Sequence, residues 1–157
     1  MTKEQELARL QMQCSRSEYC TGQVREKLRR RSVGGCLEEV DVEWIINSLL
    51  ADKFIDDSRF TAAYVRDKSR LNGWGRRKIE YQLRKLGVAG EVLETAIREN
   101  YGKEDAGADV LGNLVKRKWN SLKKEEAAAT KRLKVLRFAA GRGFEYEDIM
   151  QALRRLE

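Results

Sequence analysis

A short pattern of residue types occurs three times along the chain, and this repetition constrains the fold more than any other feature of the sequence. The pattern is Glu, any residue, aliphatic, two residues of any type, small and aliphatic, and it occupies residues 43–49, 91–97 and 147–153. Its aliphatic positions are four residues apart and share one helix face, while the small residue allows a neighbouring helix to approach closely. Each copy therefore predicts an amphipathic, packed helix.

A second pattern precedes each copy at a constant spacing. Val24, Ile79 and Val135 occupy equivalent positions, with periods of 55 and 56 residues, as expected of a helical repeat. Gly87 and Gly143 follow in the second and third copies, where the freedom of glycine to adopt a positive φ suits the end of a helix. Each pair of patterns therefore predicts a helix, a turn and a second helix.

A further amphipathic stretch leads into each pair, so nine helices are expected in three triplets. Proline, which breaks helices, is absent from all 157 residues. The sequence therefore predicts an all-α fold made of three tandem three-helix repeats that form an elongated, curved array. The apolar residues that mark the three leading stretches are Leu7, Leu10 and Cys14, then Phe60, Tyr64 and Leu71, and finally Leu111, Leu114, Val115 and Trp119.

The positive charge of the chain is unevenly distributed among the three repeats, which we assign to residues 1–53, 54–102 and 103–157. The net charge of +7 divides into 0, +3 and +4 in that order. Lysine and arginine gain free energy when they displace counterions condensed on phosphates. A polyanionic partner for the second and third repeats is therefore expected, and a merely solvated cationic face is the alternative.

An acidic pair, Asp56 and Asp57, stands at the predicted start of a helix. Asp57 or Ser58 is expected to cap this helix, and Asp56 adds a favourable charge at its positive end. Phe54 or Ile55 is expected to pack back on the first turn as a hydrophobic staple. The alternative, in which the two carboxylates bind the metal ion of a nuclease, lacks a third ligand nearby in the sequence.

Three consecutive cations, Arg76, Arg77 and Lys78, open the helix that follows a turn built from Gly73, Trp74 and Gly75. Cations at a helix N-terminus oppose the helix macrodipole, so helix stability alone does not favour them. The sequence therefore predicts an external anion at this position.

These features resemble a known family. Residues 54–68, the glycine–aromatic–glycine turn at 73–75 and the stretch KIEYQLRKLGV at 78–88 are similar to the central signature of the RecX regulatory proteins. The resemblance covers nearly the whole chain and is strongest over residues 54–97. One departure is that the family's turn commonly continues with proline, whereas Arg76 follows Gly75 here.

The resemblance implies a non-enzymatic regulator in DNA repair, recombination and the SOS response. Such a protein binds in the groove of the RecA recombinase filament on single-stranded DNA, and double-stranded DNA is a second candidate partner. It limits ATP hydrolysis, strand exchange and filament assembly by RecA. A curved, cationic array of helices suits a filament groove because it contacts several subunits together.

The residues expected to contact RecA or DNA are basic and lie in the second and third repeats. Trp44, Trp74 and Trp119 are instead expected to be buried, since large aromatic side chains usually anchor packing. The predicted contact residues are Arg66, Arg70, Arg76, Arg77, Lys78, Arg84, Lys85, Lys116, Arg117, Lys118, Lys131 and Arg132.

Two other classes of protein fit this sequence less well. A helix-turn-helix transcription factor is also small, basic and helical, but it needs one short recognition helix and usually a dimer. Three similar units spread over the whole chain fit that class poorly, and we expect a monomer. A nuclease lacks recognisable parts, because the chain has no histidine, no phosphate-binding glycine loop and no dispersed carboxylate cluster. We expect no catalytic residue.

No metal or cofactor is expected either. Cys14, Cys20 and Cys36 do not form a CxxC motif, and without histidine a zinc site is not predicted. There is no secretory leader and no apolar run near the roughly 18 residues that a membrane span requires. A cytoplasmic protein with reduced thiols is therefore expected.

Overall fold

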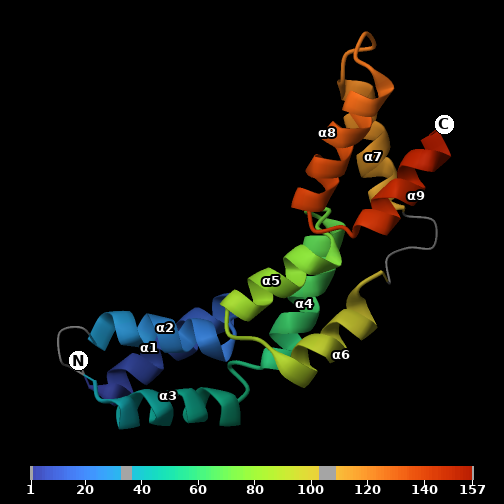
Figure 1. Ribbon diagram of the computed structural model, residues 1–157. Helices are drawn as coiled ribbons and strands as arrows, with labels where there is room; N and C mark the ends of the chain where they lie inside the picture. Colours follow the sequence, from blue (N-terminus) through green and yellow to red (C-terminus); the bar gives the residue numbers. More distant parts are fainter. Residues whose placement is uncertain (1, 33–36, 103–108, 157) are drawn as a thin grey trace. The chain divides into compact units, whose positions relative to one another are not determined.

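The structure is a computed structural model that describes residues 2–32, 37–102 and 109–156 (Figure 1). These ranges form nine helices in three triplets and contain no strand, which confirms the predicted all-α fold. Cys36 lies outside the described residues, as does Lys103, the first residue of the predicted third repeat. The helices are α1 (Lys3–Arg16), α2 (Thr21–Arg31), α3 (Glu39–Ala51), α4 (Asp57–Arg70), α5 (Arg76–Lys85), α6 (Gly90–Asn100), α7 (Val110–Ser121), α8 (Ala128–Gly141) and α9 (Tyr146–Leu156).

The chain folds into two compact units. Unit 1 comprises Met1–Ala63 and Leu83–Thr95, and unit 2 comprises Tyr64–Gln82 and Ala96–Glu157. The three helices of the second repeat, α4, α5 and α6, are therefore each divided between the two units, so this repeat does not form a compact body by itself. The repeat boundaries at residues 53 and 102 and the elongated, curved array stay predictions.

The apolar positions of the repeated pattern form the cores. Side chains of α1, α2 and α3 make one cluster in unit 1, and side chains of α7, α8 and α9 make another in unit 2. This confirms the predicted faces in all three copies. The six aliphatic residues of the pattern expose at most 6% of their surface: Ile45, Leu49, Leu93, Ile97, Ile149 and Leu153.

Leu71 is an exception to the predicted core, because 78% of its surface is exposed. Helix α4 ends at Arg70, so Leu71 lies in the turn that follows and no longer shares the buried face of Phe60 and Tyr64. The expectation that Leu71 belongs to the packed stripe of this helix is therefore wrong.

The two predicted helix-terminal glycines are confirmed. Gly87 has φ +90° and Gly143 has φ +96°. The N–H of Val88 donates to Leu83 O at 2.9 Å, and the N–H of Phe144 donates to Ala139 O at 3.3 Å. These bonds close α5 and α8 with the hydrogen-bond pattern of a Schellman cap, which requires the positive φ that glycine adopts without strain.

The acidic pair at the start of α4 caps two different helices. Asp56 Oδ1 accepts a hydrogen bond from the N–H of Arg59 at 3.0 Å, so Asp56 rather than Asp57 or Ser58 caps α4. Asp57 Oδ1 accepts from the N–H of Thr21 at 2.7 Å, at the first residue of α2. The predicted cap is therefore displaced by one residue, and Asp57 satisfies an amide that α2 itself leaves unpaired.

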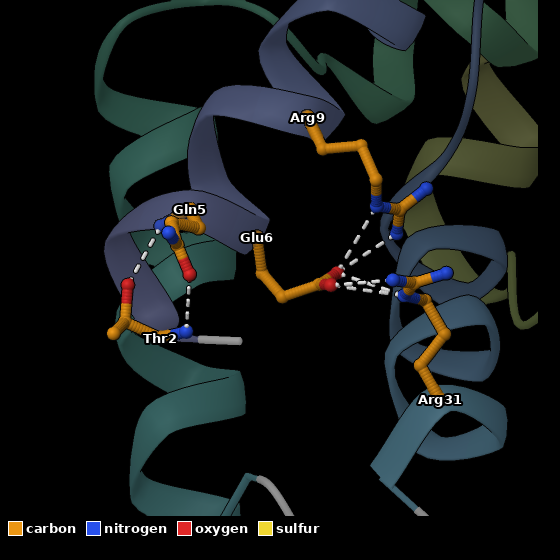
Figure 2. A network of polar contacts seen from close by, with 5 residues as sticks. All are labelled: Thr2, Gln5, Glu6, Arg9 and Arg31. Atoms are coloured by element: carbon orange, nitrogen blue, oxygen red, sulfur yellow. Dashed lines mark hydrogen bonds and ion pairs between the residues drawn. The ribbon is translucent and has the colours of Figure 1, made fainter.

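A buried carboxylate joins the ends of α1 and α2. Figure 2 shows the guanidinium groups of Arg9 and Arg31 directed at the carboxylate of Glu6, with hydrogen bonds of 2.9 Å from Arg9 Nη2 and 2.9 Å from Arg31 Nε. The side chain of Glu6 is only 3% exposed. Burial raises the pKa of Glu6, but the hydrogen bonds and charges of the two arginines outweigh it and lower the pKa below its ordinary value of 4.5.

Among the residues that the structure describes, none of the helices combines the length and the apolar character needed to cross a membrane. The same residues contain no group of three or more cysteine, aspartate or glutamate side chains placed to hold a metal ion.

Glu6→Gln is expected to lower the free energy of unfolding at pH 7 by about 1–2 kcal/mol, because charged hydrogen bonds are lost and both arginines are partly exposed. Since the pKa of Glu6 is lowered in the folded state, its contribution is present above pH 4.5 and is lost as the pH falls through the folded pKa. Urea unfolding from pH 3 to pH 7 should show the free energies of unfolding of the parent chain and of Glu6→Gln converging at low pH.

The control is Glu26→Gln, which removes an exposed pair with Arg30. This change should lower the free energy of unfolding by no more than about 0.5 kcal/mol. An equal loss in both variants would contradict this account.

Gly22→Ala should destabilise the protein, because a Cβ at Gly22 would overlap the carbonyl oxygen of Leu86 at the end of α5. Overpacking of this kind costs about 1–3 kcal/mol. Gly141→Ala is the matched control, since a Cβ there meets no atom within 4 Å and alanine favours a helix. Thermal unfolding should give a lower Tm for Gly22→Ala and an unchanged or higher Tm for Gly141→Ala. Equal Tm values would show that this contact is not tight in solution.

Candidate functional site

The excess positive charge of the chain belongs entirely to unit 2. The residues of unit 1 include 12 basic and 13 acidic side chains, for a net charge of −1. Those of unit 2 include 20 basic and 12 acidic side chains, for a net charge of +8. The structure thus divides the charge more sharply than the sequence thirds do, and a polyanion is attracted to unit 2.

Unit 2 contains a pocket of about 510 Å³ that is lined by four cations. The end of α4 contributes Arg70, α7 contributes Arg117 and Lys118, and α8 is followed by Arg142. No acidic side chain is found among the described residues that line it. We call this the basic pocket.

The charges of the basic pocket are not neutralised by the parts of the chain that the structure describes. Arg70 and Arg117 make no hydrogen bond or ion pair with any described residue. Lys118 Nζ lies 4.9 Å and Arg142 Cζ 5.0 Å from the centroid of the Phe138 ring. A ring orients these cations but does not cancel their charge, so the pocket can bind an anion.

A larger cavity in unit 1, of about 780 Å³, provides a contrast. It is also lined by cations of α2, and its arginines there have carboxylate partners, whereas Lys27 lies over an aromatic ring. Arg25 Nη2 lies 2.9 Å from Glu43 Oε1, and Arg30 Nε lies 3.1 Å from Glu26 Oε1. Because these pairs offset the charge of the cations, this cavity is a weaker anion site than the basic pocket.

The cations at the start of α5 have internal partners. Arg76 Nε lies 2.6 Å from Glu80 Oε1, Arg77 Nε lies 3.0 Å from Glu145 Oε1, and Lys78 Nζ lies 4.6 Å from the centroid of Trp74. The hydrogen bond and charge of Glu80 raise the pKa of Arg76.

The N-terminus of α5 itself faces the C-terminus of α8. The N–H of Gly75 donates to Arg142 O at 2.6 Å, and the N–H of Arg77 donates to Gly143 O at 3.1 Å. Carbonyl oxygens at a helix C-terminus carry partial negative charge. The α8 C-terminus and the two carboxylates therefore offset the cations, and the external anion predicted from the sequence is not needed to explain their position.

The remaining predicted contact residues are scattered. Arg66 is exposed and donates to Asn100 Oδ1 at 3.1 Å, and Lys116 is exposed on α7. Lys131 exposes only 9% of its surface, and its Nζ lies 4.2 Å from the Trp119 centroid. Of the others, Arg84 and Lys85 are exposed residues of unit 1, and Arg132 is a half-buried residue of unit 2.

Three of the twelve predicted residues, Arg70, Arg117 and Lys118, thus meet in the basic pocket, and the prediction missed Arg142. A cation at the end of a helix is explained by the helix dipole, so Arg142 gave no functional signal. Comparison of the repeats offers the one indication in the sequence, because the equivalent position of the second repeat is occupied by the apolar Leu86 and not by a cation.

The three tryptophans are less buried than predicted. Trp74 and Trp119 are half-buried, and Trp44 exposes 37% of its surface. Lysine side chains lie over all three rings, with Lys3 Nζ 4.6 Å from the centroid of Trp44. Each ring is therefore partly covered by a lysine side chain, and Trp119 also packs against the core of unit 2.

Comparison with known proteins identifies relatives along almost the whole chain. The model of the second three-helix domain of RecX matches residues 56–97, and that of the third matches residues 108–153. The regulatory protein RecX of Pelodictyon phaeoclathratiforme is 33% identical over 132 residues, which cover 84% of this chain and 79% of that protein. The RecX of Clostridium perfringens strain 13 is 29% identical over 157 residues, which cover 99% of this chain and 72% of the relative.

Some relatives are considerably longer. The regulatory protein RecX of Clostridium tetani is 33% identical over 116 residues, but the chain spans only 52% of that protein. Among solved structures, RecX from Lactobacillus salivarius superposes with a TM-score of 0.81 at 21% identity, covering 98% of this chain and 96% of that one. That likeness supports the fold.

The signature at residues 54–88, the order of the two matched domains and the 33% identity over most of both sequences lead to one assignment. The chain belongs to the RecX family of regulatory proteins.

Proposed function

We propose that this protein is a non-enzymatic regulator that binds the RecA recombinase filament on single-stranded DNA and limits ATP hydrolysis, strand exchange and filament assembly by RecA. Membership in the RecX family supports RecA as the partner. The basic pocket supports a polyanion as part of the target, because its four cations have no carboxylate partner among the described residues. This unopposed charge is the observation on which the proposal chiefly rests.

The proposal also covers the oligomeric state, the location, the repeat boundaries and the DNA partner of the protein. We infer a monomer in the cytoplasm, with three repeats that divide after residues 53 and 102, and with double-stranded DNA as a second candidate partner beside single-stranded DNA. The transcription-factor alternative is not supported by the family match, which covers two consecutive three-helix domains rather than one recognition helix.

The direct test is the rate of ATP hydrolysis by the cognate RecA on single-stranded DNA, with and without this protein. The proposal predicts a lower rate at stoichiometric amounts, because a regulator that occupies the filament groove opposes the active filament. Bovine serum albumin at the same concentration serves as the control. An unchanged rate over a tenfold range of protein concentration would contradict the proposal.

The pocket's part in this inhibition is tested by Arg70→Ala/Arg117→Ala. We expect the concentration for half-maximal inhibition to rise about tenfold, which corresponds to about 1.4 kcal/mol of binding free energy. Both side chains are exposed and without partners among the described residues, so the fold should persist by circular dichroism.

The matched control is Arg137→Ala/Arg154→Ala, which removes the same charge from exposed positions of α8 and α9 outside the basic pocket. If net charge alone drives binding, both double variants lose inhibition equally. The proposal requires a clearly larger loss in the pocket variant.

A further inference from the structure

Leu71 is the most exposed large apolar side chain that the structure describes, at 78%. The turn that carries it is held at both ends. The N–H of Leu71 donates to Asp67 O at 2.8 Å, the N–H of Trp74 donates to Lys68 O at 3.0 Å, and Gly73 between them has φ +65°. The backbone therefore holds Leu71 in solvent, where it contributes little to the stability of the fold.

Leu71 is not an isolated surface residue, because it lines the basic pocket. Val110, Leu114 and Phe138 line the same pocket, so its wall combines four cations with four apolar side chains. Isolated apolar side chains on a surface need no explanation, but a group of them within a charged recess indicates a ligand with an apolar part. The ligand must therefore present negative charge and an apolar face together.

The side-chain amides of Asn72 and Asn113 add a third kind of group. Both residues line the pocket and are exposed, and their amides make no hydrogen bond with any described residue. An amide offers a donor and an acceptor, so it can bond to the edge of any base. Groups of this kind permit recognition without strict sequence preference.

A nucleotide in a single strand has all the properties that this wall requires. Its phosphate is an anion, its base has an apolar face, and the base edge carries donors and acceptors. In a duplex the base faces are stacked inside, so an apolar side chain such as Leu71 has no base face to contact. A pocket of about 510 Å³ is in the range that encloses a small organic ligand.

We propose that the basic pocket binds one nucleotide of a single-stranded nucleic acid, with Arg70 and Arg117 on the phosphate and Leu71 against the base. Leu71 then distinguishes single strands from duplexes, and the arginines supply affinity that depends on salt. The inference deepens the proposed function and rests on it, since it names the ligand of the same site, but its test does not require the recombinase.

The test measures binding of the purified chain to a fluorescein-labelled oligothymidylate by fluorescence anisotropy. Inorganic polyphosphate, a polyanion without bases, competes in a second arm. Leu71→Ser is expected to weaken oligothymidylate binding about fivefold and leave polyphosphate binding unchanged. Leu71→Trp is expected to strengthen oligothymidylate binding, because an indole stacks on a base better than leucine does.

Two control variants isolate the parts of the site. Leu133→Ser replaces another exposed leucine of unit 2, 45% exposed and outside the pocket, and it should bind oligothymidylate like the parent chain. Arg117→Ala should weaken both ligands and reduce the slope of log K against log salt by about 0.7. Arg137→Ala, with the same change in charge, should leave that slope unchanged.

The binding measurements can support or overturn the inference. Equal losses in Leu71→Ser and Leu133→Ser, or binding of a duplex as tight as that of the single strand, would overturn the inference. Equal binding of oligothymidylate and oligouridylate supports it, because both expose the base and the phosphate. Normal oligonucleotide binding without any effect on ATP hydrolysis by RecA would contradict the proposed function and leave this inference intact.

Discussion

Unit 2 depends on a contact between two helix ends that only glycine permits. The N–H groups of Gly75 and Arg77 donate to the carbonyl oxygens of Arg142 and Gly143, which joins the positive end of α5 to the negative end of α8. A Cβ at Gly75 or Gly143 would overlap backbone atoms of the other helix. The same bonds satisfy amides and carbonyls that isolated helices leave unpaired, and they position Arg142 at the basic pocket.

The arginines of this protein differ in whether a carboxylate of the chain neutralises them. Arg25 and Arg30 in unit 1 and Arg77 in unit 2 each face a carboxylate, so their contribution to the local field is largely cancelled. Arg70 and Arg117 have no such partner among the described residues. A cation that is buried or paired changes the free energy of folding. An unpaired cation on the wall of a pocket instead attracts a negatively charged ligand from solution.

The sequence predicts the buried face of each helix, because burial follows the periodicity of apolar residues. It does not predict the surroundings of a side chain that depend on where a helix ends or on a contact with another helix. The repeated pattern identified the buried helix faces correctly because burial follows from spacing alone. Leu71 was placed in the core because the end of α4 cannot be located to one residue by periodicity. Lys131 was counted as a surface cation since the Trp119 ring that covers it comes from another helix, and Arg142 was missed because its helix-terminal position already explains its charge. Asp56 and not Asp57 caps α4, because Asp57 is bonded to α2.

The repeat explains the architecture of the two units but not their chemistry. Counting back by the repeat period, Arg142 corresponds to Leu86, and the carbonyl oxygen of each accepts a hydrogen bond from the residue just before the middle helix of the preceding repeat. The donor is the N–H of Gly75 in unit 2 and the thiol of Cys20, at 3.5 Å, in unit 1. The junction is thus a shared structural solution. The turn that carries Leu71 corresponds instead to residues 16–18, which contain arginine, serine and glutamate rather than leucine, asparagine and glycine. Because the supporting contact is kept while the side chains on the wall differ, the pocket is a specialisation of unit 2 rather than a consequence of the fold.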